Sequence, residues 1–189
     1  MTSAQRISVL HVGSTIPRKR IDVLLETLAL VVKSRPDVRL WRVGGPFTPE
    51  QTRHARELGV ADRIVVLPFV PRKVVAALYR RAALVLLPSE REGLGLPVIE
   101  AMACGTPVVC TDLPVLREVA GDAAEYCPLR DPSAWAARIT SLLRERESRP
   151  DLWEARRAAG LARSTAFTWT RYAEAMQDIY ERVALEPVR

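Results

Sequence analysis

Residues 84–107 read LVLLPSEREGLGLPVIEAMACGTP, and this stretch decides the fold. Its first four residues form a short apolar run that is typical of a buried strand. A loop with two glycines follows, and then a helical segment over 97–104 that begins at a proline and ends at Gly105. A strand followed by a loop and a helix is the repeating unit of a parallel α/β sheet.

The same unit recurs on both sides of this stretch. The pattern predicts further strands at 7–12, 38–43, 64–67, 108–111 and 124–127, and helices at 21–34, 49–58, 73–81, 133–146, 152–162 and 168–184. Continuous apolar strands separated by helices predict a sheet covered on both faces. We therefore expect an α/β fold, with a Rossmann-like, doubly wound parallel sheet and a helical C-terminal tail.

Length and composition indicate one soluble domain. The chain has 189 residues, which suits a single domain with its core over about 6–165 and a terminal helix over about 168–184. No apolar run is long enough to cross a membrane, and the N-terminus enters a strand at once, which leaves no room for a signal peptide. The three cysteines, Cys104, Cys110 and Cys127, have no metal-ligand spacing, and their odd number argues against a disulfide framework. We expect a reduced, cytoplasmic protein.

The chain is basic, with a formal net charge of +6. Such a balance favours nucleic acids, anionic membranes or phosphorylated small ligands. The arginines are scattered over many predicted helices, and no stacking aromatics accompany a basic stripe, which argues against nucleic acid.

Ligands of such sheets bind at the carboxyl ends of the strands, so we expect the functional residues in the loops that follow the strands. The loop after the first strand places Gly13 near three consecutive cations, Arg18, Lys19 and Arg20. That combination suits a diphosphate, although a solvated run of charge is the alternative.

The loop after residue 87 combines glycines with carboxylates. Gly93 and Gly95 let the backbone approach a ligand, and their amides, together with the start of the helix, favour an anion. Glu92 stands in the loop and Glu100 about one turn into the helix, so both can face one cleft; for either residue alone, a capping role is the alternative. The two glycines are not a dinucleotide fingerprint, because Val98 occupies the place of the third.

The chain resembles the C-terminal, donor-binding domain of GT-B-fold, retaining glycosyltransferases of family 4. Residues 88–107 match the block P-S-x-x-E-G-x-G-x-P-x-x-E-A-M-A-x-G-x-P of that family, with its E-x7-E motif at Glu92 and Glu100. Residues 13–19, 43–45 and 167–169 resemble the first phosphate-binding loop, the second glycine loop and the terminal segment of the family. The resemblance covers roughly residues 6–184 and implies one half of a GT-B fold.

The resemblance also implies a reaction, in which a sugar moves from a nucleoside diphosphate to an acceptor hydroxyl with retention of configuration. It implies no cofactor and no metal. The implied catalytic residues are Glu92, Lys19 and Arg18. The implied donor-binding residues are Gly13, Ser14, Gly44, Gly45, Phe69, Val70, Gly93, Leu94, Gly95 and Glu100. Three positions depart from the family pattern: Ser14 replaces a frequent arginine, Leu94 a frequent aromatic residue, and Pro68 a frequent glycine.

Several readings of the whole protein stay open. The acceptor-binding domain of the family has no counterpart in these residues, so the expected partners are a nucleoside diphosphate sugar and an acceptor-binding domain or subunit, and the acceptor is compatible with a membrane surface. The alternatives are a non-catalytic nucleotide-sugar-binding module, the donor-binding subunit of a two-chain transferase, or a domain excised from a longer enzyme. A glycosidase with Glu92 and Glu100 as its carboxylate pair is disfavoured, because the diphosphate loops argue for transfer.

The predicted terminal helix carries an apolar stripe. Its members recur at spacings of three and four: Trp169, Tyr172, Ala173, Met176, Ile179, Tyr180 and Val183. One expectation is that part of this stripe packs on the chain's own sheet. The other is that it stays bare and leads to self-association or covers a partner.

Overall fold

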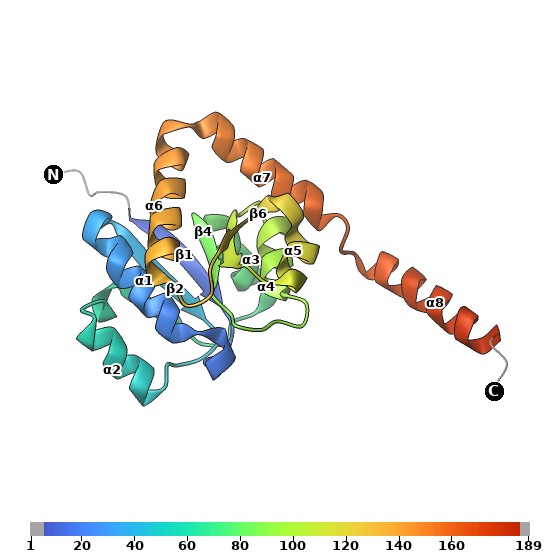
Figure 1. Ribbon diagram of the computed structural model, residues 1–189, viewed down its shortest axis with the longest axis horizontal. Helices are drawn as coiled ribbons and strands as arrows, with labels where there is room; N and C mark the ends of the chain where they lie inside the picture. The colour runs from blue at the N-terminus through green and yellow to red at the C-terminus, as the bar shows by residue number, and fades with distance from the viewer. Residues whose placement is uncertain (1–5, 186–189) are drawn as a thin grey trace.

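The computed structural model describes residues 6–185, and its centre is a six-stranded parallel sheet (Figure 1). The sheet order is β3-β2-β1-β4-β5-β6. The strands are β1 (Ile7–Val12), β2 (Val38–Val43), β3 (Ile64–Leu67), β4 (Leu84–Leu87), β5 (Val108–Thr111) and β6 (Ala124–Cys127). All neighbouring pairs are parallel, as the apolar runs predicted.

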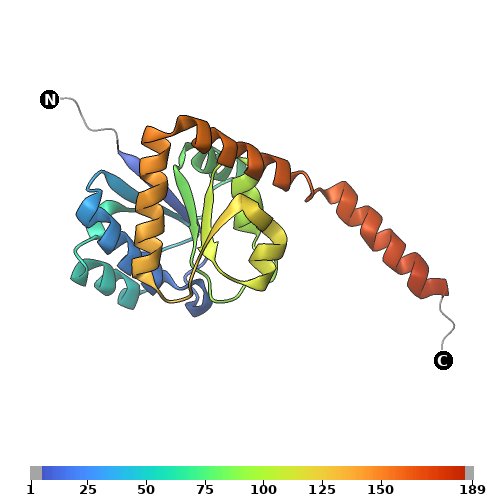
Figure 2. The ribbon, with the colours of Figure 1, turned by 45° about the horizontal axis from the view of Figure 1, so that its top comes forward.

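Helices cover both faces of the sheet (Figure 2). One face carries α1 (Ile21–Ser34), α2 (Pro49–Glu57) and α6 (Pro132–Ser148), and α6 packs along α1. The other carries α3 (Arg72–Arg81), α4 (Leu96–Ala103) and α5 (Pro114–Ala120). Helix α7 (Pro150–Ser164) crosses from α6 to α4. The doubly wound fold class is therefore confirmed.

The strand order creates a switch point between β1 and β4. From β1 the chain builds outward through β2 to β3, then returns to place β4 on the other side of β1. Leu10 of β1 faces Val85 of β4 in the register, so the loops that follow these two strands leave the sheet side by side. Because ligands of open α/β sheets bind at such a point, the loops after β1 and β4 are where a site is expected.

Four short elements were missed by the sequence reading. These are helix α5 and the 3-10 turns at Pro17–Lys19, Ala61–Arg63 and Gly121–Ala123, which lie in segments without a predicted helix or strand. Helix α5 has only seven residues, too few for a clear apolar period. The residues at its ends were the available signal, because Pro114 begins the helix and Gly121 follows it at a positive φ of 54°.

Helix α8 (Trp169–Leu185) projects away from the sheet and its covering helices (Figures 1 and 2). The expectation that part of its stripe packs on the chain's own sheet is wrong, since Trp169 is 86% exposed and Tyr180 is 66% exposed. Only Met176 is half-buried among the stripe residues. Apart from Met176, the stripe residues of α8 thus remain uncovered within residues 6–184.

None of the helices in residues 6–185 combines the length and apolar character needed to cross a bilayer. In the same residues, no group of three or more histidine, cysteine, aspartate or glutamate side chains converges on a point where a metal ion could sit. All three cysteines are free thiols, and Cys110 and Cys127 are buried.

Candidate functional site

Buried Arg42 ties together the two glycine loops that follow β1 and β2. Its guanidinium donates from Nη2 to the carbonyl of Gly13 at 2.8 Å and to that of Gly44 at 3.3 Å, and from Nη1 to the carbonyl of Gly45. Burial lowers the pKa of Arg42, but a guanidinium stays charged in proteins. A fixed positive charge therefore lies directly beneath both loops.

Gly44 packs backbone to backbone against Gly13. A Cβ built on Gly44 would collide with the carbonyl group of Gly13, and the φ of Gly44 is 124°. The amide of Gly13 also donates to the carbonyl of Val43 at 2.9 Å. These contacts require glycine at residue 44, and they make the two loops one continuous surface.

Lys19 and Arg18 converge on Glu92, across the switch point. The ammonium group of Lys19 lies 2.6 Å from Oε1 of Glu92, and Nη1 of Arg18 lies 3.4 Å from Oε2. The side chains of Lys19 and Glu92 are 9% and 6% exposed, whereas that of Arg18 is 40% exposed. The three residues that the resemblance implied as catalytic thus form one cluster, with a buried ion pair at its centre.

Glu92 is held as a carboxylate by this cluster. Burial disfavours its charge, but the hydrogen bond from Lys19 and the charges of Lys19 and Arg18 outweigh burial and keep the pKa of Glu92 below its usual range. Glu92 therefore balances the positive charges of Lys19 and Arg18 within this cluster.

The segment after Glu92 offers unused backbone donors. Within residues 6–185, no hydrogen bond of the protein uses the amides of Gly93, Leu94 or Gly95. Gly93 has open space around its Cα, and Leu94 is 47% exposed. Gly95 caps α4 at a φ of 77° and fits tightly against Leu116. Free amides at the start of a helix are suited to bind an anion or hydroxyl oxygens.

Glu100 is oriented by a buried tyrosine. It stands on α4, exposed to solvent, and its Oε2 accepts a 2.8 Å hydrogen bond from the hydroxyl of Tyr79. Burial, together with the charge of Glu100, raises the pKa of Tyr79, so the phenol stays a donor. Glu100 therefore does not cap its own helix, and one of its oxygens remains available for a ligand.

The remaining predicted residues lie along the rim of these loops. The ring of Phe69 is 82% exposed and lies over Gly45, whose added Cβ would stand 3.6 Å from the ring. Val70 is half-buried beside it in the loop between β3 and α3. Ser14 is half-buried after Gly13 and makes no hydrogen bond within residues 6–185. The structure thus brings Phe69, the glycine loops and the Lys19–Glu92 pair into one band, while Glu100 is placed by α4.

Three contributors escaped the sequence reading. Arg42 and Tyr79 lie inside a predicted strand and a predicted helix, where a buried polar residue gives no loop signal. His11 lies beneath Gly13 and is fully buried; burial, with the charges of Arg42 and Lys19, lowers its pKa to about 3, so it is neutral. The available signal was a polar residue near the end of a mostly apolar strand, at 42 in β2 and at 11 in β1.

A cleft within the described residues lies beside this band and not on it. It has a volume of about 720 Å3 and lies between α1, α2 and the loop after β4, with Arg18 on its border. Neither the glycine loops nor Glu92 or Glu100 line it. Arg18 and Arg20 both line this cleft. They differ in their partners, because Arg18 contacts Glu92 together with Lys19, whereas Arg20 contacts Asp22 and Glu90.

The chain is similar to known proteins over nearly its whole length. Residues 3–159 match the family described as Glycosyl transferases group 1. The D-inositol 3-phosphate glycosyltransferase of Segniliparus rotundus is 36% identical over 192 residues, which cover 96% of this chain and 42% of that protein. The protein of the same name from Xylanimonas cellulosilytica is 38% identical over 180 residues, covering 91% and 41%. The chain thus spans about two fifths of the length of these curated relatives.

Solved structures agree on the fold. Sucrose-phosphate synthase from Thermosynechococcus elongatus superposes with a TM-score of 0.81 at 28% identity, over 94% of this chain and 45% of that chain. A glycosyltransferase from Rickettsia africae superposes with a TM-score of 0.85 at 18% identity, over 97% and 49%, and at that identity it supports the fold alone.

Proposed function

This chain belongs to the glycosyl transferases of group 1, as the C-terminal, donor-binding half of a GT-B fold, and we propose that it holds a nucleoside diphosphate sugar for transfer to an acceptor hydroxyl with retention of configuration. The observation that carries the proposal is the cluster of Lys19, Arg18 and Glu92 at the switch point of the sheet. It combines cations for a diphosphate with a carboxylate for a sugar in one place.

The site residues take the following roles in the proposal. Lys19 and Arg18 stabilise the negative charge that grows on the departing diphosphate, which is electrostatic stabilisation aimed at the transition state. Glu92 lies beside the transferred sugar. The amides at Gly93, Leu94 and Gly95 hold sugar hydroxyls or phosphate oxygens.

In the proposal, residues outside the Lys19–Glu92 cluster hold the nucleoside. Glu100, fixed by Tyr79, accepts hydrogen bonds from the ribose diol, for which a carboxylate has two oxygens. Phe69 and Val70 border the base, and the loops at Gly13, Ser14, Gly44 and Gly45 follow the diphosphate. The charge of buried Arg42 adds to the potential of these loops.

The acceptor is proposed from the relatives. The curated relatives carry the name D-inositol 3-phosphate glycosyltransferase, so a phosphorylated polyol is the first acceptor to test. Most of the length of those relatives has no counterpart in these 189 residues. We therefore infer that transfer needs a further acceptor-binding region, and that the exposed stripe of α8 is covered by that region or by a second copy of the chain.

Calorimetry with uridine, guanosine and adenosine diphosphates tests the binding half of the proposal. We expect one of them to bind, and transfer by the isolated chain to be poor unless a segment equivalent to the remainder of the relatives is added. No heat with any of the three would refute the proposal. Binding without transfer, even with that segment present, would favour the alternative of a non-catalytic nucleotide-sugar-binding module.

A further inference from the structure

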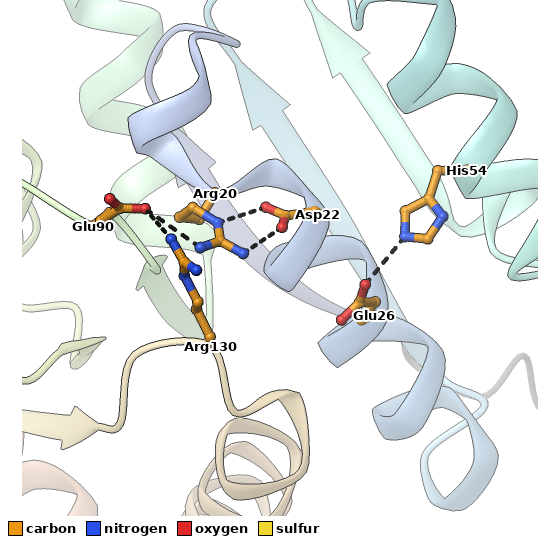
Figure 3. A network of polar contacts seen from close by, with 6 residues as sticks. All are labelled: Arg20, Asp22, Glu26, His54, Glu90 and Arg130. Atoms are coloured by element: carbon orange, nitrogen blue, oxygen red, sulfur yellow. Dashed lines mark hydrogen bonds and ion pairs between the residues drawn. The ribbon is translucent and has the colours of Figure 1, made fainter.

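Glu90 joins three loops that lie far apart in the sequence (Figure 3). Its Oε2 accepts a hydrogen bond from Nη1 of Arg20 at 3.4 Å and another from Nη2 of Arg130 at 3.0 Å. Arg20 follows the loop after β1, Glu90 belongs to the loop after β4, and Arg130 belongs to the loop after β6. Arg20 is held in turn by Asp22, whose Oδ1 accepts from its Nε at 2.9 Å.

Both arginines have a backbone conformation that a residue with a side chain rarely adopts. The φ angles of Arg20 and Arg130 are 50° and 61°, and no other non-glycine residue within 6–185 has a positive φ. Such strain persists only where surrounding contacts over-determine it. Glu90 is a contact that both strained residues share.

The same segments carry the Lys19–Glu92 pair. The amide of Glu90 donates to the carbonyl of Arg18 at 2.8 Å, and Nη1 of Arg18 donates to the carbonyl of Arg91 at 2.9 Å. Five hydrogen bonds or ion pairs thereby join residues 18–20 to residues 90–92. Among them, Lys19 pairs with Glu92 and Arg20 pairs with Glu90. Any displacement of Glu90 would move Glu92, two residues later.

We propose that Glu90 is a positioning residue, which together with Arg20 and Arg130 sets where Glu92 and Lys19 stand and so how tightly a donor diphosphate is held. The consequence for binding rests on the proposed function; the positioning of the loop does not. Exposed ion pairs add little to global stability. Loss of the Glu90 charge is therefore expected to act on the loop and on the affinity, with little change in the unfolding temperature.

The chain contains a matched control at the other end of α1. Arg35 pairs with Asp37, two residues later, at 3.0 Å, and with distant Glu147 at 2.6 Å, as Arg20 pairs with Asp22 and Glu90. The side chains of Arg20 and Arg35 are similarly buried, at 14% and 13% exposure. Glu147→Gln thus removes the same kind of ion pair away from the donor loops.

The experiment compares Glu90→Gln, Arg130→Ala and Glu147→Gln in the full chain. Hydrogen exchange followed residue by residue by NMR reports on the amides of Lys19, Arg20 and Glu90, each of which donates to a carbonyl within these joined loops. Calorimetry reports on uridine, guanosine and adenosine diphosphates. We expect these amides in Glu90→Gln and Arg130→Ala to exchange roughly tenfold faster and both variants to bind about fivefold more weakly, while Glu147→Gln matches the unmodified chain in both measurements.

Each other outcome has a fixed meaning. Unchanged exchange at the amides of Lys19, Arg20 and Glu90 in Glu90→Gln overturns the inference, and so does an equal increase in Glu147→Gln, which would indicate general loosening. If the unmodified chain binds none of the diphosphates, the proposed function fails, while the exchange comparison still decides the role of Glu90.

Discussion

The ammonium group of Lys19 and the carboxylate of Glu92 lie 2.6 Å apart and are almost entirely buried, although their sequence positions differ by 73. Each belongs to the loop that follows one of the two central strands. Their pairing links the two loops across the switch point of the sheet. On the proposed function, a donor diphosphate therefore meets cations that already have a carboxylate partner.

The Lys19–Glu92 pair predicts a pH-dependent contribution to stability. The pKa of Glu92 is lowered in the folded state, so its contribution is fully present above the ordinary glutamate pKa of about 4.3 and is lost as the pH falls through the lower, folded value. We expect Glu92→Gln to lower the free energy of unfolding by about 3 kcal/mol at pH 7, because it leaves a buried ammonium unpaired. Urea titrations should show the difference from the unmodified chain shrinking below pH 4; a constant difference would contradict this assignment.

Glu100→Ala should weaken nucleoside diphosphate binding by roughly 1–3 kcal/mol, since hydrogen bonds to a charged group are lost. Tyr79→Phe keeps the carboxylate but removes its buried donor, so it should cost less, about 0.5–1.5 kcal/mol. Glu92→Ala should affect nucleotide affinity less than Glu100→Ala and any sugar-dependent step more. Calorimetry measures the nucleotide affinity of the three variants, and donor turnover measures the sugar-dependent step. If all three keep the affinity and the turnover of the unmodified chain, the two glutamates have structural roles only.

Gly44→Ala should destabilise the chain by about 1–3 kcal/mol, because the new methyl group meets the Gly13 carbonyl and the backbone at 44 has a φ of 124°. Gly93→Ala is the matched control: its Cβ would meet nothing within 4 Å, and it should cost less than about 1 kcal/mol. Thermal unfolding separates the two variants. Similar losses at both positions would mean that the two glycine loops do not depend on close packing.

The stripe of α8 predicts self-association at micromolar concentration. Ile179 and Tyr180 are 43% and 66% exposed, so Ile179→Glu combined with Tyr180→Glu should leave the unfolding temperature unchanged and shift sedimentation toward the monomer. Thr170→Glu, an exposed polar position of the same helix, controls for the added charge. A monomer at all concentrations in the unmodified chain would leave the acceptor-binding region as the cover for the stripe.

Removal of divalent metal ions should not change donor binding. Lys19, Arg18 and buried Arg42 supply the positive charge around the diphosphate loops, so the proposal needs no ion to bridge the phosphates. Calorimetry with the same nucleotide in EDTA and in excess Mg²⁺ checks this, with affinities expected to agree within about twofold. A tenfold loss in EDTA would place a metal ion in the donor complex.

The fold was predictable because most of its strands are continuous runs of apolar residues. All four residues of β4 and all four of β5 are buried. A continuous apolar run of this length is typical of a strand that is covered on both faces of the sheet. Helix α5 is too short to show a helical period of apolar residues. The apolar stripe of α8 predicts a helix, but it does not predict whether this chain or a partner covers the stripe, and so it does not predict the direction of the helix.

The candidate site was predictable as a set of loops but not as a set of contacts. Glycines and charges at strand ends identified residues 13–19 and 92–95. The pairing of Lys19 with Glu92 depends on the distance between two loops, and the separate direction of Arg20 depends on Asp22 and Glu90. Arg42 and Tyr79 act from below the surface, where the sequence shows only a polar residue in an apolar element.

The return of the chain from β3 to β4 has a consequence for synthesis on the ribosome. When residues 18–20 emerge, residues 90–92 have not yet been made, and Arg130 follows later still. Until the second half of the sheet is made, Arg18 and Lys19 lack the carboxylate that they contact in the finished fold. The site that we propose for the donor therefore forms only when β4 pairs with β1, late in synthesis.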